Sequence, residues 1–133
     1  MAIDLFDEFA TDITAEEEGA WETFADEVRF KIARSTSKTY TRILTKSYEK
    51  NRRLLSTQSD ASEAKSEELM IDAMARGLLL DWENVVWQKK PLPYTLENAK
   101  MILANKDFRR WVMQKAEDFD RFKLAQEAED EGK

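Results

Sequence analysis

Along most of the chain, apolar residues recur at steps of three and four, the spacing that places them on one face of a helix. The clearest stripe follows Ser35-Thr36-Ser37, whose hydroxyl side chains are favoured helix N-caps. Its members are Tyr40, Ile43, Leu44, Ser47, Tyr48, Leu54 and Leu55. Similar stripes predict helices over about 63–76, 96–105 and 108–122. We therefore predict a mainly α protein with about four to five helices in one small domain.

One N-terminal segment has the spacing of a strand. Val28, Phe30 and Ile32 alternate with charged residues, a period of two that is typical of a half-buried strand. With Trp21 to Phe24 this pattern predicts a short β-hairpin over about 21–34. The connection Ala25-Asp26-Glu27 has no Asn-Gly or Gly turn signal, so a helix entering here is the alternative.

The two ends of the chain are polar and differ in character. Residues 1–18 are acidic and carry Leu5, Phe6 and Phe9 near helical spacing. We expect either a frayed, mobile arm or an amphipathic segment that orders when its Leu/Phe face docks on another surface. Residues 127–133 read as a polar tail. Because the chain has no internal repeat and no low-complexity linker, residues 1–133 are expected to form a single domain.

The composition argues against an enzyme. The 133 residues include no His and no Cys, which excludes an imidazole base, a thiolate nucleophile and the usual zinc ligands. Acid pairs such as Asp81/Glu83 and Asp118/Asp120 are expected by chance where 36% of residues are charged. The three glycines are isolated, so no Gly-rich phosphate loop is present. We expect no catalytic residue, no cofactor and no metal.

The apolar runs bear on location. They are only a few residues long, far short of the ~20 needed to cross a bilayer, and the N-terminal stretch is acidic where a signal peptide is basic. We expect a cytoplasmic protein without a membrane segment.

Charge is divided unevenly along the chain. Residues 1–27 hold ten acids and no Lys or Arg, whereas residues 28–56 hold nine basic groups and one acid. This arrangement permits neutralisation within one chain, contact between copies, or an acidic shield over a polyanion site. Tyr40 and Tyr48 fall on the apolar stripe and not beside the cations, and the pI is near 4.9, so nucleic-acid binding is disfavoured.

Residues 75–122 carry a distinctive order of features: an apolar run, Asp-Trp, a short insertion, Pro-Leu-Pro-Tyr-Thr and Glu-Asn-Ala, followed by an aromatic-rich stretch. In this order the segment resembles the C-terminal half of the tail assembly chaperones of long-tailed, non-contractile, lambda-like bacteriophages. The matching positions are Asp81, Trp82, Pro91, Pro93, Tyr94, Thr95, Glu97, Asn98 and Ala99. Val85 to Gln88 depart from the family, whose loops are more often acidic and glycine-rich.

This resemblance implies a non-enzymatic assembly factor. Such chaperones are made in the cytoplasm of the infected bacterial host, bind the tape measure protein while the tail tube assembles, and are absent from the mature virion. Many also occur as a longer, frameshifted form that engages the tail tube protein, and members tend to self-associate as rings or spirals.

These considerations give two functional hypotheses. In the first, several copies cover the tape measure protein with the Leu78-Leu79-Leu80/Trp82/Trp87 surface and with the basic helix predicted after Ser37. The acidic arm of each copy, residues 1–18, contacts residues 28–56 of a neighbouring copy. The expected interaction residues are Leu5, Phe6, Phe9, Arg42, Lys46, Arg53, Leu79, Trp82, Trp87 and Tyr94. In the second, a small phage regulatory protein binds nucleic acid through residues 29–53 and guards that face with its arm.

Overall fold

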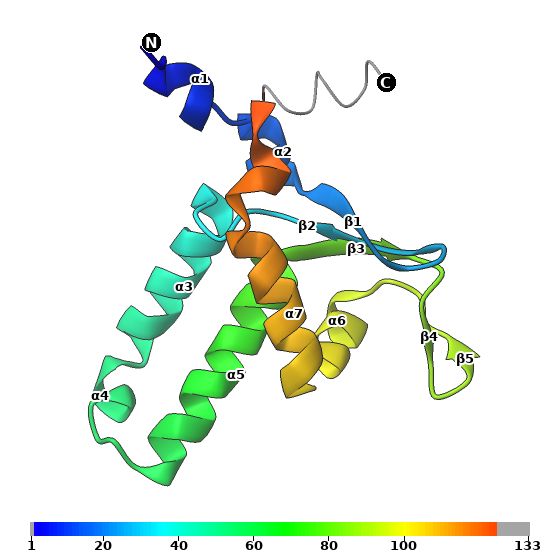
Figure 1. The fold of residues 1–133 in the computed structure, drawn as a ribbon. Coiled ribbons are helices and arrows are strands. Elements are labelled where there is room, and N and C mark those ends of the chain that lie inside the picture. The colour runs from blue at the N-terminus through cyan, green and yellow to red at the C-terminus, as the bar shows by residue number, and fades with distance from the viewer. Residues whose placement is uncertain (1, 125–133) are drawn as a thin grey trace.

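A three-stranded antiparallel sheet forms the centre of the molecule, with helices packed beside and beneath it (Figure 1). The computed structural model describes residues 2–124, so the polar tail expected over 127–133 lies outside the described residues. The strands are β1 (Ala20–Ala25), β2 (Val28–Ile32) and β3 (Leu79–Glu83), in the order β1-β2-β3. A separate two-stranded ribbon consists of β4 (Val86–Trp87) and β5 (Lys90–Pro91).

The prediction of a mainly α fold is wrong, because the chain is a mixed α/β domain. Residues 79–83 form β3, which pairs with β2 so that Phe30 lies opposite Trp82. The pairing has an irregularity at Leu80, so the buried residues Leu79 and Trp82 are three positions apart and the strand shows no regular period of two. Within that prediction, the hairpin over about 21–34 corresponds to β1 and β2, which pair from Ala20↔Ile32 to Ala25↔Val28.

Both tight connections use left-handed backbone at residues other than glycine. Asp26 has φ 51° in the β1–β2 connection, and aspartate adopts this conformation more readily than most residues. Gln88 and Lys89 have φ 49° and 70° between β4 and β5, where a type I′ turn requires positive φ at both central positions. The β1–β2 hairpin therefore forms although its connection contains no Asn-Gly or Gly turn signal.

The described residues contain seven α-helices rather than the predicted four to five. The elements are α1 (Leu5–Phe9), α2 (Ile13–Glu18), α3 (Lys38–Lys50), α4 (Arg52–Leu55), α5 (Asp60–Gly77), α6 (Leu96–Leu103), α7 (Lys106–Glu117) and the 3-10 turn η1 (Phe119–Phe122). Caps define several starts: Ser59 caps α5, Thr95 caps α6 and Asn105 caps α7. The additional helices are short ones, α1, α2 and α4, which carry too few residues for a periodic pattern.

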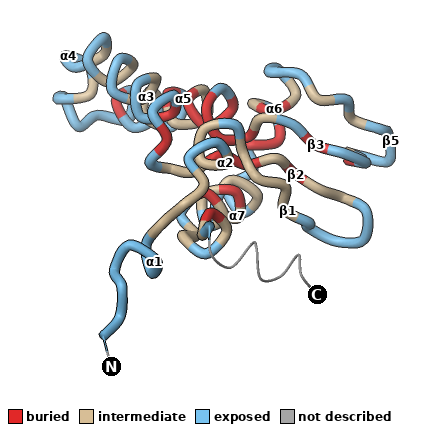
Figure 2. Tube along the Cα trace, turned by 90° about the horizontal axis from the view of Figure 1, so that it is seen from above, coloured by how far each residue is buried: buried red, intermediate tan, exposed pale blue. Residues whose placement is uncertain are grey.

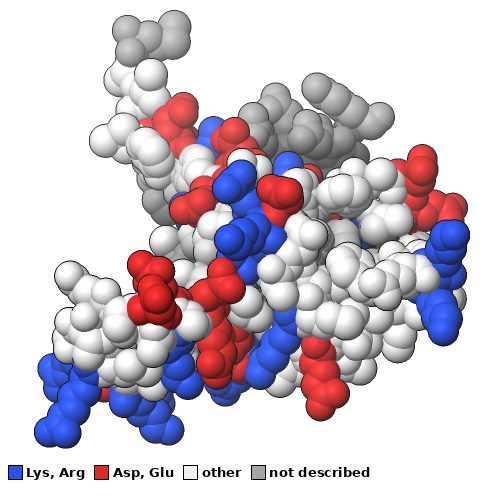
Figure 3. Space-filling view, turned by 90° about the horizontal axis from the view of Figure 1, so that it is seen from below, with Lys and Arg blue, Asp and Glu red and all other residues white. Residues whose placement is uncertain are grey.

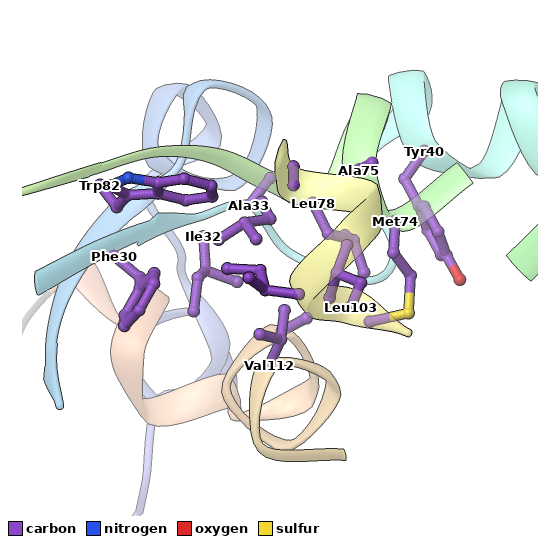
Figure 4. Close-up of a cluster of buried hydrophobic side chains, with 14 of the residues drawn as sticks. Phe30, Ile32, Ala33, Tyr40, Met74, Ala75, Leu78, Trp82, Leu103 and Val112 are labelled. Carbon is purple, nitrogen blue, oxygen red and sulfur yellow. The ribbon is translucent and has the colours of Figure 1, made fainter. Parts of the chain in front are cut away.

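The core lies between the sheet and the helices α5, α6 and α7 (Figure 4). Phe30 and Trp82 extend from the sheet, and Leu103 and Val112 extend from α6 and α7. Tyr40 joins α3 to the same cluster and is 4% exposed. At the crossing of α3 and α5, a Cβ on Gly77 would lie 2.8 Å from Tyr40 Cα, so glycine permits this close approach.

The N-terminal arm projects from the body, and every residue of α1 is exposed (Figure 2). Its base is fixed by two backbone hydrogen bonds: Asp12 N donates to Phe122 O at 2.8 Å, and Leu124 N donates to Ala10 O at 3.1 Å. The beginning of the chain is therefore attached to the last described turn.

Candidate protein-interaction sites

The arm carries an unusual amount of exposed apolar surface. Leu5, Phe6 and Phe9 are 65–74% exposed. They lie on one side of α1. The acids Asp7 and Glu8 lie on the other side together with Asp4 at the N-cap, because residues three and four positions apart share a helix face. The Phe9 ring approaches Phe119 with centroids 5.9 Å apart. The structure thus presents the three predicted arm residues as the apolar face of a short amphipathic helix.

Arg42, Lys46 and Arg53 lie on the outer side of α3 and α4, where all three are exposed. Figure 3 shows Lys and Arg side chains gathered at the corner of the molecule that these helices form. Within residues 2–124, no carboxylate lies within ion-pair distance of these three side chains. The predicted basic residues therefore form one cationic face.

A groove of about 430 Å³ runs along this face between α3 and α5, and we call it the basic groove. It is lined by Arg42, Ile43, Lys46, Glu49, Lys50 and Arg76, together with Ser47. Arg76 is also paired with Asp72 at 3.4 Å. The alkyl stems of Lys and Arg can cover apolar groups while their charges stay in water, so this groove combines an apolar floor with a positive rim.

Three predicted contact residues belong instead to the framework of the fold. Leu79 is fully buried and Trp82 is 6% exposed. Trp82 Nε1 donates to Leu92 O at 2.7 Å, and Tyr94 Oη donates to Leu79 O at 2.8 Å. The two rings pack edge to face with centroids 4.9 Å apart, and burial raises the pKa of Tyr94. These side chains hold the loop around Leu92, between Pro91 and Tyr94, onto β3 and leave little surface for a partner.

Trp87 lines a second groove of about 420 Å³ on another side of the molecule, which we call the apolar groove. Phe24, Val28, Phe30, Val86, Trp87 and Phe108 are among its lining residues. Val86 is 61% exposed and Phe24 is 55% exposed. The sequence pattern did not indicate Phe24, Val86 and Phe108 as contact residues. Phe24 lies at an irregularity in the β1–β2 pairing, between Thr23 and Ala25, and no local pattern in the sequence indicates such a position.

Part of the acidic arm is neutralised within the chain. Glu16 pairs with Arg34 at 3.4 Å. The Glu17 carboxylate accepts hydrogen bonds from Lys38 N at 2.7 Å and from Thr39 N at 3.4 Å, which places a negative charge at the N-terminus of α3. The acids of α2 therefore bind groups at the start of the basic segment, at Arg34, Lys38 and Thr39. They do not contact Arg42, Lys46 or Arg53.

The acid pairs considered for chemistry have structural partners. Glu83 binds Arg29 at 3.0 Å, and the Arg29 hydrogen bond holds the Glu83 pKa below its usual range. Asp118 accepts from Asp120 N at the start of η1. Among residues 2–124 no group of three or more acidic side chains has the geometry of a metal site. None of the helices in that range has the length and apolar character that a bilayer crossing needs.

A comparison with protein families decides the origin of the chain. The model of the family described as YdaY prophage protein matches residues 32–133. The chain belongs to this prophage protein family. Searches of the curated proteins and of the solved structures give no match. The YdaY family match identifies a phage-derived protein, and it begins at the last residue of β2, so α1, α2 and β1 precede the matched region.

Proposed function

We propose that this YdaY family protein is a tail assembly chaperone that binds the tape measure protein and supports tail tube assembly without catalysing a reaction. Its phage origin and the resemblance of residues 75–122 support the proposal. The residues that carry the resemblance, such as Trp82 and Tyr94, are framework residues, so they support a shared fold more directly than a shared binding site.

The observation that carries the proposal is the apolar groove. A tape measure protein is long and rich in apolar helix, and its exposed stripe needs cover until the tube surrounds it. An amphipathic helix commonly binds by placing its apolar face in a hydrophobic groove. Aromatic side chains such as Trp87 and Phe108 are favoured anchors at such sites. We therefore assign the tape measure contact to this groove.

Co-expression with the tape measure protein of the same phage, followed by a pull-down, tests the proposal. Val86→Glu places a charge at an exposed groove position and should reduce the amount captured by about tenfold or more, whereas Val86→Leu should retain capture. Leu96→Glu is the matched control, because Leu96 is 43% exposed and lies outside the groove lining. Failure of the unmodified chain to capture the tape measure protein would overturn the proposal.

The cations Arg42, Lys46 and Arg53, which have no ion-pair partner among residues 2–124, favour a second candidate, a small phage regulatory protein that binds nucleic acid through residues 29–53. Phe30 and Tyr40 are buried, which leaves Tyr48 as the one aromatic side chain of this segment that could stack on bases. A gel-shift assay at low salt distinguishes the two functions, since phosphate contacts weaken steeply as salt rises. A chain that lacks residues 2–9 and still causes no shift would exclude this candidate.

A further inference from the structure

The acidic side of α1 and the basic groove are complementary in charge and in pattern. α1 offers Asp7 and Glu8 beside the apolar side chains Leu5 and Phe9. The basic groove offers the cations Arg42, Lys46 and Lys50 around Ile43, and these outnumber the one acid of its lining, Glu49. An acidic amphipathic helix laid along the groove would set its acids against the cationic rim and its apolar residues over the floor and the alkyl stems.

The two surfaces lie on different sides of one chain. Figures 1 and 2 both place α1 and the α4 end of α3 far apart, and the base of α1 is fixed to Phe122 and Leu124. The five residues of α1 extend only about 7 Å at 1.5 Å per residue. The contacts made within the chain come from α2, where Glu16 and Glu17 meet Arg34 and the start of α3. Within residues 2–124, the outer cations Arg42 and Lys46 of α3 therefore have no acidic partner.

We infer that α1 of one copy docks in the basic groove of a second copy. The occupant is this chain itself, because its own arm has the charge and the apolar face that the groove would accept. Each copy contributes a different surface, so the contact is head to tail and can extend to further copies. The inference concerns the protein alone and goes beyond the proposed function, since it needs no tape measure protein.

The area of one short helix is small, so we expect a weak, concentration-dependent association. Light scattering after size exclusion, over a concentration series of the full chain, should show a mass above the 15.6 kDa monomer that decreases as salt rises. A chain that remains monomeric across the series would overturn the inference.

Charge reversal on either surface isolates the contact. Asp7→Lys with Glu8→Lys on the arm, or Arg42→Glu with Lys46→Glu in the groove, should each weaken association by about tenfold or more. A mixture of the two variants should associate again, because each chain supplies the surface that the other lacks. Lys89→Glu with Lys90→Glu is the matched control for the groove reversal, since it makes the same charge change at exposed residues of the β4–β5 turn and should leave association unchanged. Circular dichroism verifies that every variant is folded.

Two results would assign the groove to another occupant. If both reversals leave the mass unchanged, the arm and the groove do not meet. If a chain ending at Leu124 loses association while the arm variant keeps it, the acids of residues 127–131 and not α1 are responsible, and the inference is wrong. Capture of the tape measure protein is measured separately with Val86→Glu, so failure of one proposal is distinguishable from failure of the other.

Discussion

The Arg121 guanidinium donates to the Glu22 carboxylate at 3.1 Å and so joins η1 to β1 across 99 residues of sequence. Arg121 also donates to the carbonyls of Lys115 at 2.6 Å and Ala20 at 2.8 Å, and its side chain is only 8% exposed. Burial lowers the pKa of Arg121, whereas the charge of Glu22 raises it and offsets part of that effect. One side chain therefore connects the strand, the end of α7 and η1.

Replacement of Arg121 should be costly. Arg121→Met keeps most of the apolar stem but removes every hydrogen bond of the guanidinium and leaves Glu22 with Lys115 alone. We expect the free energy of unfolding to fall by about 2–4 kcal/mol, measured by urea denaturation. Arg110→Met is the control, because Arg110 is 73% exposed on α7 and should cost less than about 0.5 kcal/mol. Equal effects of the two substitutions would contradict this role for Arg121.

Gly77 should reverse the usual preference of a helix for alanine. In an open helix, alanine is more favourable than glycine by about 1 kcal/mol. At Gly77, however, the new Cβ would lie 2.8 Å from Tyr40 Cα, which is backbone and cannot rotate away. We expect Gly77→Ala to lower the free energy of unfolding by about 1–3 kcal/mol through separation of α3 and α5. A neutral or stabilising result would show that the two helices move apart easily.

Glu17 should stabilise α3 from outside that helix. Ser37 occupies the N-cap position but makes no side-chain capping hydrogen bond, and the Glu17 carboxylate binds the first two amides of α3 in its place. Glu17→Ala should therefore cost about 1 kcal/mol in thermal or urea unfolding. The neighbouring exposed residue gives the comparison: Glu18→Ala should change stability by less than about 0.5 kcal/mol.

Tyr40 should make the protein sensitive to alkaline pH. Burial raises the pKa of its phenol to about 12, with smaller contributions from the charges of Tyr48 and Glu117. Since the folded pKa lies above the unfolded value of about 10, this stabilisation is complete below pH 10 and is lost as pH rises through 12. We expect a decrease on the order of 2–3 kcal/mol over that interval.

The Tyr40→Phe variant isolates this effect. It removes the phenol proton and the hydrogen bond from Tyr40 Oη to Met70 Sδ at 3.3 Å, and so should cost less than about 1 kcal/mol at pH 8. Between pH 10 and 12 its stability should fall less than that of the unmodified chain. Urea unfolding at pH 8, 10 and 11 checks the difference, and parallel pH profiles would exclude Tyr40 as the group that titrates.

The sequence predicted the long helices better than the sheet. The stripes around Leu69 and Leu103 correspond to α5 and α6, because a helix that packs on one side has a period of 3.6. β3 could not be recognised in the same way, since Leu79 and Trp82 are both buried and the pairing partner, β2, is about fifty residues away along the chain. A local pattern contains no information about such pairing.

The interaction surfaces divide along similar lines. Leu5, Phe6 and Phe9 stand out as exposed apolar residues and Arg42, Lys46 and Arg53 as exposed cations, the surface character that their local patterns indicate. Trp82 and Tyr94 have the large aromatic side chains common at interfaces, but their polar atoms are used inside the fold. The apolar groove combines residues from three distant segments, so only the folded chain brings Phe24, Val86 and Phe108 together.

The strand order also constrains how the protein is made on the ribosome. β1 and β2 emerge early, but β2 has an unpaired edge until Leu79 to Glu83 are synthesised, and Arg121 reaches Glu22 only when nearly the whole chain is available. Folding that depends on such distant contacts is slow relative to local helix formation, and unpaired strand edges favour aggregation meanwhile. Truncated products that end before η1 should therefore accumulate as insoluble material, whereas chains that include η1 should not.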